Sequence, residues 1–372
     1  MSALLLLAAF AWAVATSGGT SARDMAVTVV LLGLGMATVG RRAPHPALLG
    51  GATAVLVAWL LVDGPMRLGW TLESVRVPVL AVVVVLATLV AASLSRDERE
   101  GWIVGLVVVA CLAAAVAIGQ AVVHLAVGAD AAPRAGGLLG SPNALGLLLV
   151  AAAVLVVRAW MDEGRAGWAA ALGLLCVGVI ATGSRTALVV GATVAVVWAL
   201  SSRGAHRAVI AAVAVVGAGG VIAWRTAAEG VGDRPLIWAE AWERFAASPI
   251  VGEGAPTAAY LAQGPGRPTA HAHLEPLQWG VEYGLVGLLL LTAVISAGMI
   301  LVRTADRVDP GYALASLVLV AGGMLDFSLR ITAIAVVAAV LGAFALTEPG
   351  RGPDTAQSSV RSRTSWRVAT FG

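Results

Sequence analysis

The feature that most constrains this chain is a succession of apolar stretches, each about as long as a membrane-spanning helix. The hydrocarbon core of a bilayer requires roughly 20 apolar residues per helix, with a range of about 17–25. Stretches of this kind recur along the chain, at residues 2–17, 24–40, 46–63, 77–95, 101–127, 138–160, 167–183, 185–201, 207–224, 277–302, 311–328 and 330–347. They predict an all-α integral membrane protein with about 12 transmembrane helices.

Two pairs of these stretches are almost contiguous. Residue 184 alone separates 167–183 from 185–201, and residue 329 alone separates 311–328 from 330–347. Each junction predicts either a tight turn or a helix that is broken within the membrane.

Composition agrees with this class and excludes others. Hydrophobic residues make up 59% of the chain, charged residues 12%, and the mean hydropathy is +0.90, which excludes an ordinary soluble domain. The net charge of +3 is not arranged as a basic stripe with interleaved aromatics, so we expect no nucleic-acid partner. Cys111 and Cys176 both lie in apolar stretches and are expected to pack there rather than to form a disulfide or a metal site.

The distribution of arginines predicts the orientation in the membrane, because cytoplasmic short loops carry an excess of positive residues. With a cytoplasmic N-terminus, most arginines of the short loops and the tail fall inside: Arg41, Arg42, Arg96, Arg99, Arg158, Arg165, Arg203, Arg207, Arg303, Arg307, Arg351, Arg361, Arg363 and Arg367. Fewer fall outside: Arg23, Arg67, Arg76, Arg134, Arg185 and Arg330. We therefore predict a protein of the inner (plasma) membrane with both termini in the cytoplasm.

This orientation divides the chain into three parts. Residues 1–347 form a polytopic membrane domain, and the apolar stretch at its N-terminus is interpreted as a retained helix because it lacks a basic segment before it. Residues 225–274 form a long extracytoplasmic loop between the ninth and tenth helices, and residues 348–372 form a disordered cytoplasmic tail.

The long loop carries a helix signal of its own. Asp233-Arg234-Pro235 is typical of a helix start, and Trp238, Trp242 and Phe245 follow at helical spacing. A short helix with two tryptophans on one side is expected to lie flat on the membrane surface or to pack on the transmembrane bundle, and the two arrangements are compatible. Either arrangement holds Arg234 at the membrane edge.

Polar residues interrupt the apolar background at two further places. Asn143 follows Pro142 at the start of a helix, shortly after Arg134, and either caps that helix or meets a ligand. Arg185, within Thr182-Gly-Ser-Arg-Thr, lies between two apolar stretches. An arginine at this depth costs several kcal/mol unless it meets an anion or water, which favours a functional role, with a structural ion pair as the alternative.

The turn from the long loop into the next helix carries two histidines, His271 and His273, beside Glu275, Gln278 and Glu282. A third histidine or cysteine ligand is missing nearby, so we expect no metal site. His271 is expected to be the more exposed of the two histidines, and Glu275 or Glu282 to orient the ring of His273.

Farther along the chain, Asp326 and Arg330 are four residues apart. At this spacing they are expected to form an ion pair at the outer end of the eleventh helix.

These residues together predict a cluster of arginines with one or two histidines on the outer face. The planar guanidinium group suits phosphate, and a neutral imidazole suits taking a proton from a hydroxyl near pH 7. The sequence has no Walker loop, Rossmann glycine pattern or G-x-S-x-G elbow, and ATP is absent outside the cytoplasm. The leaving group must then bring its own energy, as a polyprenyl diphosphate does.

Four segments, in this order, resemble the O-antigen ligase / O-antigen polymerase superfamily of C-type, lipid-dependent glycosyltransferases. They are Gly140-Ser-Pro-Asn143-Ala-Leu-Gly146, Thr182-Gly-Ser-Arg185, Arg234-Pro-Leu-Ile-Trp238 with Pro249-Ile-Val-Gly252-Glu-Gly254, and Ala272-His273 with Leu277-Gln278 and Glu282-Tyr-Gly284. Leu325-Asp326-Phe-Ser-Leu-Arg330 is similar to a further segment of some members. The family's asparagine after the histidine is Leu274 here, a departure from its pattern.

The resemblance implies an inverting, metal-independent glycosyltransferase without cofactors that works on the extracytoplasmic face. Its donor would be a polyprenyl-diphosphate-linked glycan in the bilayer, and its acceptor a glycan, lipid or protein. Arg185 and Arg234 would bind the diphosphate and His273 would activate the acceptor hydroxyl. The implied substrate-binding residues are Asn143, Arg134, Trp238, Glu282, Asp326 and Arg330.

Ligases, polymerases and protein O-oligosaccharyltransferases share these segments, and the sequence does not separate them. A secondary transporter of an organic or inorganic anion is the alternative, because arginines in broken helices also serve transport. That alternative predicts charged residues near the bilayer midplane and an internal repeat, and no clear repeat is present.

The predicted orientation can be tested by labelling a cysteine substituted for Ala258, in the long loop. A membrane-impermeant thiol reagent is expected to label it in intact cells, once outer layers are permeabilised if needed, because the arginine distribution places this loop outside. Labelling that requires cell lysis would reverse the predicted orientation.

Overall fold

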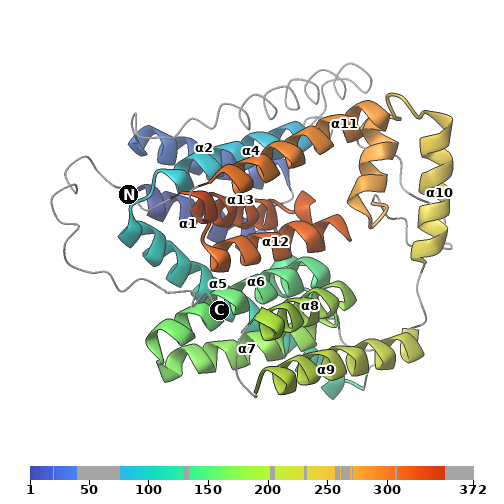
Figure 1. Ribbon diagram of the computed structural model, residues 1–372. Helices are drawn as coiled ribbons and strands as arrows, with labels where there is room; N and C mark the ends of the chain where they lie inside the picture. Colours follow the sequence, from blue (N-terminus) through green and yellow to red (C-terminus); the bar gives the residue numbers. More distant parts are fainter. Residues whose placement is uncertain are drawn as a thin grey trace, which may run out of the picture.

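The computed structural model describes residues 1–19, 21–39, 76–128, 134–201, 206–229, 233–255, 260, 269, 271–305 and 308–347. Over these residues the chain is helical, and the β-type pairing found there is an isolated bridge between Tyr260 and Thr269. The predicted all-α class is confirmed (Figure 1). The described helices are α1 (Ser2–Ala15), α2 (Ala22–Val39), α4 (Arg76–Ala92), α5 (Arg96–Ala126), η2 (Gly137–Leu139), α6 (Pro142–Glu163), α7 (Ala166–Thr182), α8 (Arg185–Ser201), α9 (His206–Glu229), α10 (Arg234–Ala247), α11 (Glu275–Thr304), α12 (Pro310–Met324), η3 (Ser328–Arg330) and α13 (Thr332–Leu346).

Each predicted apolar stretch within the described residues corresponds to a helix, whereas the stretch at 46–63 and the tail at 348–372 lie outside them. The described helices α5, α6 and α11 are long and apolar enough to cross a membrane, and others, such as α7 and α13, are apolar but shorter. These helices indicate a membrane protein. The number of about 12 crossing helices and the extent of the loop at 225–274 stay predictions.

The two nearly contiguous junctions are turns. Gly183 ends α7 with a positive φ of 56°, and the Ser184 hydroxyl accepts a hydrogen bond from the Ala187 amide at 3.2 Å, which caps α8. At the other junction α12 ends at Met324, and η3 leads into α13.

Helix α6 is the centre of the described bundle. Its residues 143–152 are all buried, and it contacts α5, α7, α8 and α12. Small residues allow these neighbours to approach closely: a Cβ on Gly178 of α7 would lie 2.7 Å from the Ala114 Cβ of α5. Contact through small side chains is typical of helices that associate in membranes.

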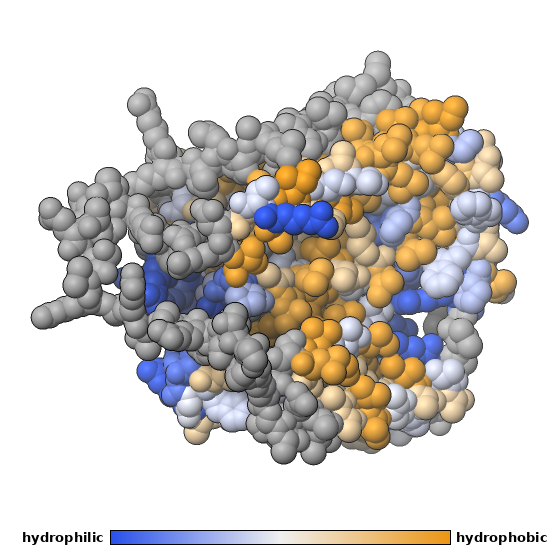
Figure 2. Space-filling model, viewed as in Figure 1, coloured by the Kyte–Doolittle hydropathy of each residue, from blue (hydrophilic) through white to orange (hydrophobic). Residues whose placement is uncertain are grey.

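Outward-facing side chains of the long helices are apolar. Leu112 of α5 is 59% exposed, and Leu289 and Met299 of α11 are 70% and 53% exposed. The face of the molecule in Figure 2 is accordingly hydrophobic over much of its described surface. Exposed apolar faces of this extent suit contact with lipid rather than with water.

The beginning of the chain and the end of α13 lie at one end of the bundle, away from α10 (Figure 1). The Met1 amino group is 3.6 Å from Glu98 Oε1, and Arg99 Nη1 donates to the Thr347 carbonyl at 2.5 Å. Arg158 and Asp309 form an ion pair of 2.6 Å between the end of α6 and the start of α12. Charged residues that the arginine distribution places in the cytoplasm are therefore grouped at this end.

Helix α11 is broken at Gly284, whose φ of 60° and ψ of −158° lie outside the helical region. The break frees backbone groups, and residues 249–254 bind them. Leu285 N donates to Pro249 O at 2.8 Å and Val286 N to Ile250 O at 3.1 Å, while Glu253 N and Gly254 N donate to the carbonyls of Val281 and Glu282 at 2.8 and 2.9 Å. Irregular backbone within a membrane protein requires such internal partners.

The two backbone segments approach too closely for a side chain at the contact. A Cβ on Gly284 would overlap the Ile250 backbone, and a Cβ on Gly252, which also has a positive φ of 70°, would overlap the Glu282 backbone. This contact explains why the Pro-x-x-Gly-x-Gly and Glu-x-Gly segments occur together in one chain.

Gly284→Ala is expected to destabilise the protein, because alanine would hold a strained positive φ and collide with Ile250. Strain of this kind costs about 1–3 kcal/mol before the collision is counted. Thermal unfolding in detergent measures the effect. The matched control is Gly298→Ala in the same helix, where no atom lies within 4 Å of the added Cβ. Equal melting temperatures for the two variants would contradict the packing described here.

Candidate active site

The first part of the site joins the start of α6 to the junction of α7 and α8. Ser184 Oγ donates a hydrogen bond to Asn143 Oδ1 at 2.8 Å, and both residues are buried. Gly146 permits this contact, because a Cβ there would lie 2.6 Å from the Ala187 Cβ and 3.2 Å from the Ser184 Cβ. The Asn143 and Arg185 segments, predicted separately, are therefore adjacent in space.

Asp326 is the residue at which the predicted segments meet. Its carboxylate is fully buried and follows the end of α12. Oδ1 lies 2.9 Å from His273 Nδ1 and 3.7 Å from Arg234 Nη2, and Oδ2 accepts from the Ser328 hydroxyl at 3.2 Å. The Asn143 side chain also favours the ionised form of this carboxyl group.

These partners keep Asp326 ionised. Burial alone raises the pKa of its carboxyl group, but the hydrogen bond of His273, the positive charge of Arg234 and the Asn143 side chain outweigh burial and hold the pKa below its usual range. An ionised carboxylate accepts hydrogen bonds only, so Nδ1 of His273 carries the proton that it donates to Asp326. Nε2 of a neutral His273 is then left as a proton acceptor.

The backbone holds His273 in a strained conformation. Its φ of 54° lies in the left-handed region, which non-glycine residues rarely adopt. The preceding residue fixes this geometry: Trp238 Nε1 donates to the Ala272 carbonyl at 2.9 Å, and the Ala272 amide donates to Gln278 Oε1 at 2.7 Å. Trp238 and Gln278 thus position the histidine from two different helices.

The structure distinguishes the two histidines. The ring of His271 stacks on Phe327 at 4.5 Å between centroids, and its buried Nδ1 has no hydrogen-bond partner among the described residues. Burial first, then the charge of Arg330, lowers the pKa of His271 to about 3. Both histidines are half-buried, so the expectation that His271 is the more exposed of the two stays a prediction. His273 contacts Phe327 edge-on and is 20% exposed.

A second buried network lies beside the first. Arg330 donates from Nε to Glu275 Oε1 at 2.8 Å and from Nη1 and Nη2 to the two oxygens of Glu282 at 2.8 and 2.9 Å. Gln278 Nε2 also donates to Glu282 Oε1, at 2.7 Å. The guanidinium group of Arg330 is thereby bound on both of its edges, at the position where α11 begins.

Two expectations about these acids were wrong. Asp326 pairs with His273 and Arg234 rather than with Arg330, because the α-helix ends at Met324 and the four-residue spacing does not apply. The carboxylate that binds the His273 ring belongs to Asp326 rather than to Glu275 or Glu282, which bind Arg330.

Arg185 and Arg134 lie close to this cluster in the fold. Arg185 is the first residue of α8, directly after Ser184, and its side chain is half-buried. Arg134 has an exposed side chain, and the next residue donates its amide to the Ala181 carbonyl at 3.3 Å, so its segment runs beside the end of α7.

Sequence reasoning gave no site role to Ser184, Gln278, Phe327 or Ser328. Two of these residues could have been found from the sequence. Ser184 directly precedes a predicted helix, as N-cap residues do, and Gln278 lies one helical turn before Glu282. The contacts of Phe327 and Ser328 arise from the turn after α12 and have no such signal.

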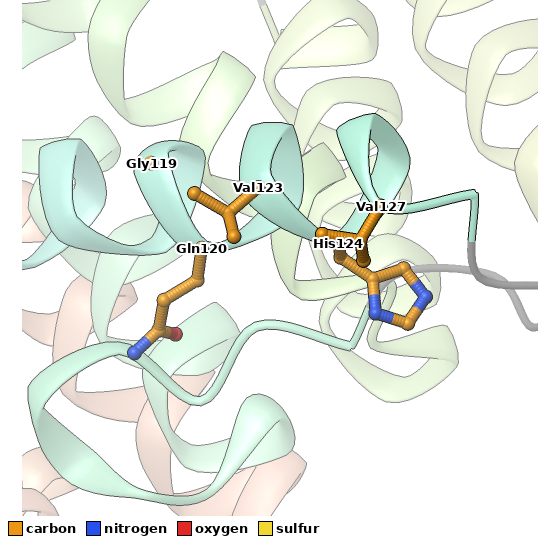
Figure 3. A pocket seen from close by; sticks show the side chains of 5 residues that line it. All are labelled: Gly119, Gln120, Val123, His124 and Val127. Carbon is orange, nitrogen blue, oxygen red and sulfur yellow. The ribbon is translucent and has the colours of Figure 1, made fainter.

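An open depression elsewhere on the described surface has fewer titratable side chains than the cluster around Asp326. It lies at the end of α5 and is lined by Gly119, Gln120, Val123, His124 and Val127 (Figure 3). Gln120 Oε1 accepts from the Gly137 amide at 2.9 Å, so this side chain supports η2. The depression has one titratable side chain, whereas the cluster around Asp326 combines acids, arginines and a histidine.

Comparison with known proteins agrees with the geometry. Residues 170–292 match the family described as O-antigen ligase (Wzy_C). The resemblance to the O-antigen ligase/polymerase superfamily is confirmed. The matched range includes Arg185, Arg234 and His273, and the family supports a glycosyltransferase of the ligase or polymerase kind. No curated protein matches the chain.

Arg330→Gln is expected to destabilise the protein strongly, because it leaves the buried carboxylates of Glu275 and Glu282 without their cation. Removing one partner of a buried ion pair costs about 3–5 kcal/mol. The control is Arg96→Gln, whose 2.8 Å pair with Glu100 is exposed and contributes at most about 1 kcal/mol. Thermal unfolding in detergent compares the two, and equal shifts would show that Arg330 does not hold α11.

Proposed function

We propose that the protein moves a glycan from a polyprenyl-diphosphate carrier to an acceptor hydroxyl on the extracytoplasmic face of the inner membrane, with inversion at the sugar carbon. The observation that carries this proposal is the contact of His273 with the buried Asp326 carboxylate, 3.7 Å from Arg234. His273, the proposed proton acceptor, and Arg234, the proposed phosphate-binding residue, thus both interact with the carboxylate of Asp326.

In this mechanism His273 is the general base. Nε2 takes the proton of the acceptor hydroxyl while the oxygen attacks the anomeric carbon of the donor sugar. The imidazolium ion that results is stabilised by Asp326, which already accepts a hydrogen bond from Nδ1. The bond between the anomeric carbon and the diphosphate oxygen breaks, and attack from the opposite side inverts the configuration.

The arginines stabilise the leaving group. Polyprenyl diphosphate departs with its bonding electron pair, and the guanidinium groups of Arg185 and Arg234 would neutralise the negative charge that grows on it. In this proposal the arginines supply the charge that a metal ion supplies in other glycosyl transfers. Asn143, Arg134 and Trp238 are proposed to contact the substrates, whereas the bonds of Arg330 and Glu282 to each other favour a positioning role for that pair.

The position of the cluster favours an enzyme over an anion transporter. Asn143, Arg185 and Arg234 stand at the starts of their helices, and Asp326 follows the end of α12. Transporter sites lie near the bilayer midplane, between halves of broken helices. A site at the helix ends suits instead a reaction between a lipid-borne donor and an acceptor from outside, with both termini and the tail in the cytoplasm.

The proposal is tested with purified protein in nanodiscs, a polyprenyl-diphosphate oligosaccharide and a mixture of glycan, lipid and peptide acceptors. Product and free polyprenyl diphosphate are expected without nucleotide, and EDTA is expected to leave the rate unchanged. The acceptor that is modified decides between polymerase, ligase and protein glycosyltransferase. Anion flux into proteoliposomes without any transfer would favour a transporter.

His273→Ala is expected to lower turnover by about 10²–10⁴-fold, the usual contribution of a general base. Asp326→Asn is expected to act in the same direction, because it removes the charge that orients the ring and stabilises its protonated form. Donor binding, measured separately, should change little in His273→Ala.

The matched control is His271→Phe, which keeps the stack on Phe327 and removes both ring nitrogens, of which Nδ1 has no hydrogen-bond partner among the described residues. Its turnover is expected to stay close to that of the unmodified protein. A larger loss in His271→Phe than in His273→Ala would transfer the role to His271.

A further inference from the structure

Two charged side chains of helix α10, those of Glu240 and Arg244, lie on the face that packs against the protein. Ile237 and Ala241 are fully buried on this face. Arg244 pairs there with Glu240 at 2.8 Å and with Glu253 at 3.9 Å, and its guanidinium group lies 4.7 Å from the ring centre of Tyr260. The polar groups of the helix are therefore satisfied from within the protein.

The opposite face of α10 is apolar and exposed. Leu236 is 58% exposed and Trp242 61%, and Ala239, Ala246 and Ala247 are exposed beside them. Trp238, 37% exposed, lies at the edge of this face, where its Nε1 donates to the Ala272 carbonyl. Glu243 is the one charged side chain of α10 on this face. A surface helix in water usually has mainly charged and polar residues on its outward face.

This face continues into the outward surface of α11. Ile250, which follows α10, is 65% exposed, and its carbonyl accepts from the Val286 amide at 3.1 Å. Leu285, whose amide donates to the Pro249 carbonyl, is 48% exposed, and Leu289, one turn farther along α11, is 70% exposed. Figure 1 shows α10 running crosswise to the bundle helices at the end of the bundle, beside the bent start of α11.

We infer that α10 is an in-plane membrane anchor, whose exposed apolar face lies in the lipid of the outer leaflet. Its occupant is bilayer lipid, because the face is continuous with the outward side of α11, a helix long and apolar enough to cross the membrane. Tryptophan is favoured at the level of lipid headgroups, where an apolar ring and a polar N–H are both satisfied.

The anchor has a consequence for the site. Arg234 is the first residue of α10 and lies 3.7 Å from Asp326. The depth of α10 in the leaflet therefore sets the height of Arg234 relative to the headgroups. The anchor itself does not depend on the proposed transfer reaction, since it follows from exposure and charge alone.

The test uses a background in which Cys111 and Cys176 are replaced by alanine. Trp242→Cys and Ala246→Cys, one turn apart on the exposed face, are labelled with an environment-sensitive fluorophore in phosphatidylglycerol/phosphatidylethanolamine nanodiscs. Leu289→Cys on α11 is the lipid-facing control, and Glu100→Cys at the opposite end, whose native side chain is 59% exposed, is the water-facing control. Ala246→Cys replaces a small exposed residue, so folding is preserved even where loss of Trp242 disturbs it.

Lipids spin-labelled near the headgroup are expected to quench both α10 positions, as they quench Leu289→Cys, while aqueous iodide quenches Glu100→Cys alone. Iodide quenching at both α10 positions would show that the face meets water. Protection from both quenchers would show that another protein surface covers it, and either result overturns the inference. Because no transfer is measured, the result is independent of the proposed catalysis.

Discussion

The arrangement of the site depends on one buried carboxylate. A charge with no exposure to solvent is costly unless it is paired and hydrogen-bonded, so Asp326 requires the groups that surround it. Those groups come from the start of α6, from the turn before α11, from the start of α10 and from η3. The need to compensate a single charge thus fixes four segments that are distant in the sequence, and it selects which nitrogen of His273 carries the proton.

A second constraint is the break in α11. Gly284 frees backbone groups that residues 249–254 bind. Arg330 binds Glu275 and Glu282, which lie in the part of α11 before this break. Gln278 connects the two networks, since it accepts from the Ala272 amide and donates to Glu282. The first part of α11 is therefore bound both to Arg330 and, through Gln278, to the residue before His273. These bonds explain how His273 can be held at a positive φ.

The helices were predictable from the sequence because their apolar stretches are long and uninterrupted, and α10 because proline follows Arg234 at a helix start. The resemblance pointed to His273, and the structure brings its ring to Asp326, while its catalytic role stays a prediction. The partners of the acidic residues were not predictable from the sequence. Asp326 and Arg330 have the spacing of an ion pair on a helix, but the helix ends before them. Partners such as Glu275 and Arg330, 55 residues apart, are decided by tertiary packing, which periodicity does not encode.

In the proposed reaction, the charges of the two networks distinguish which arginines could bind the donor. Arg330 is bound on both edges by carboxylates and has little capacity left for a phosphate. Arg234 is 3.7 Å from a carboxylate that His273 approaches more closely, and its side chain is 36% exposed, so its remaining N–H groups can meet an incoming anion. A diphosphate bound there would offset the positive charge that His273 gains when it takes the acceptor proton. Donor binding at Arg234 would then favour proton transfer to His273, because both residues interact with Asp326. This coupling would be absent if His273 and Arg234 had separate partners.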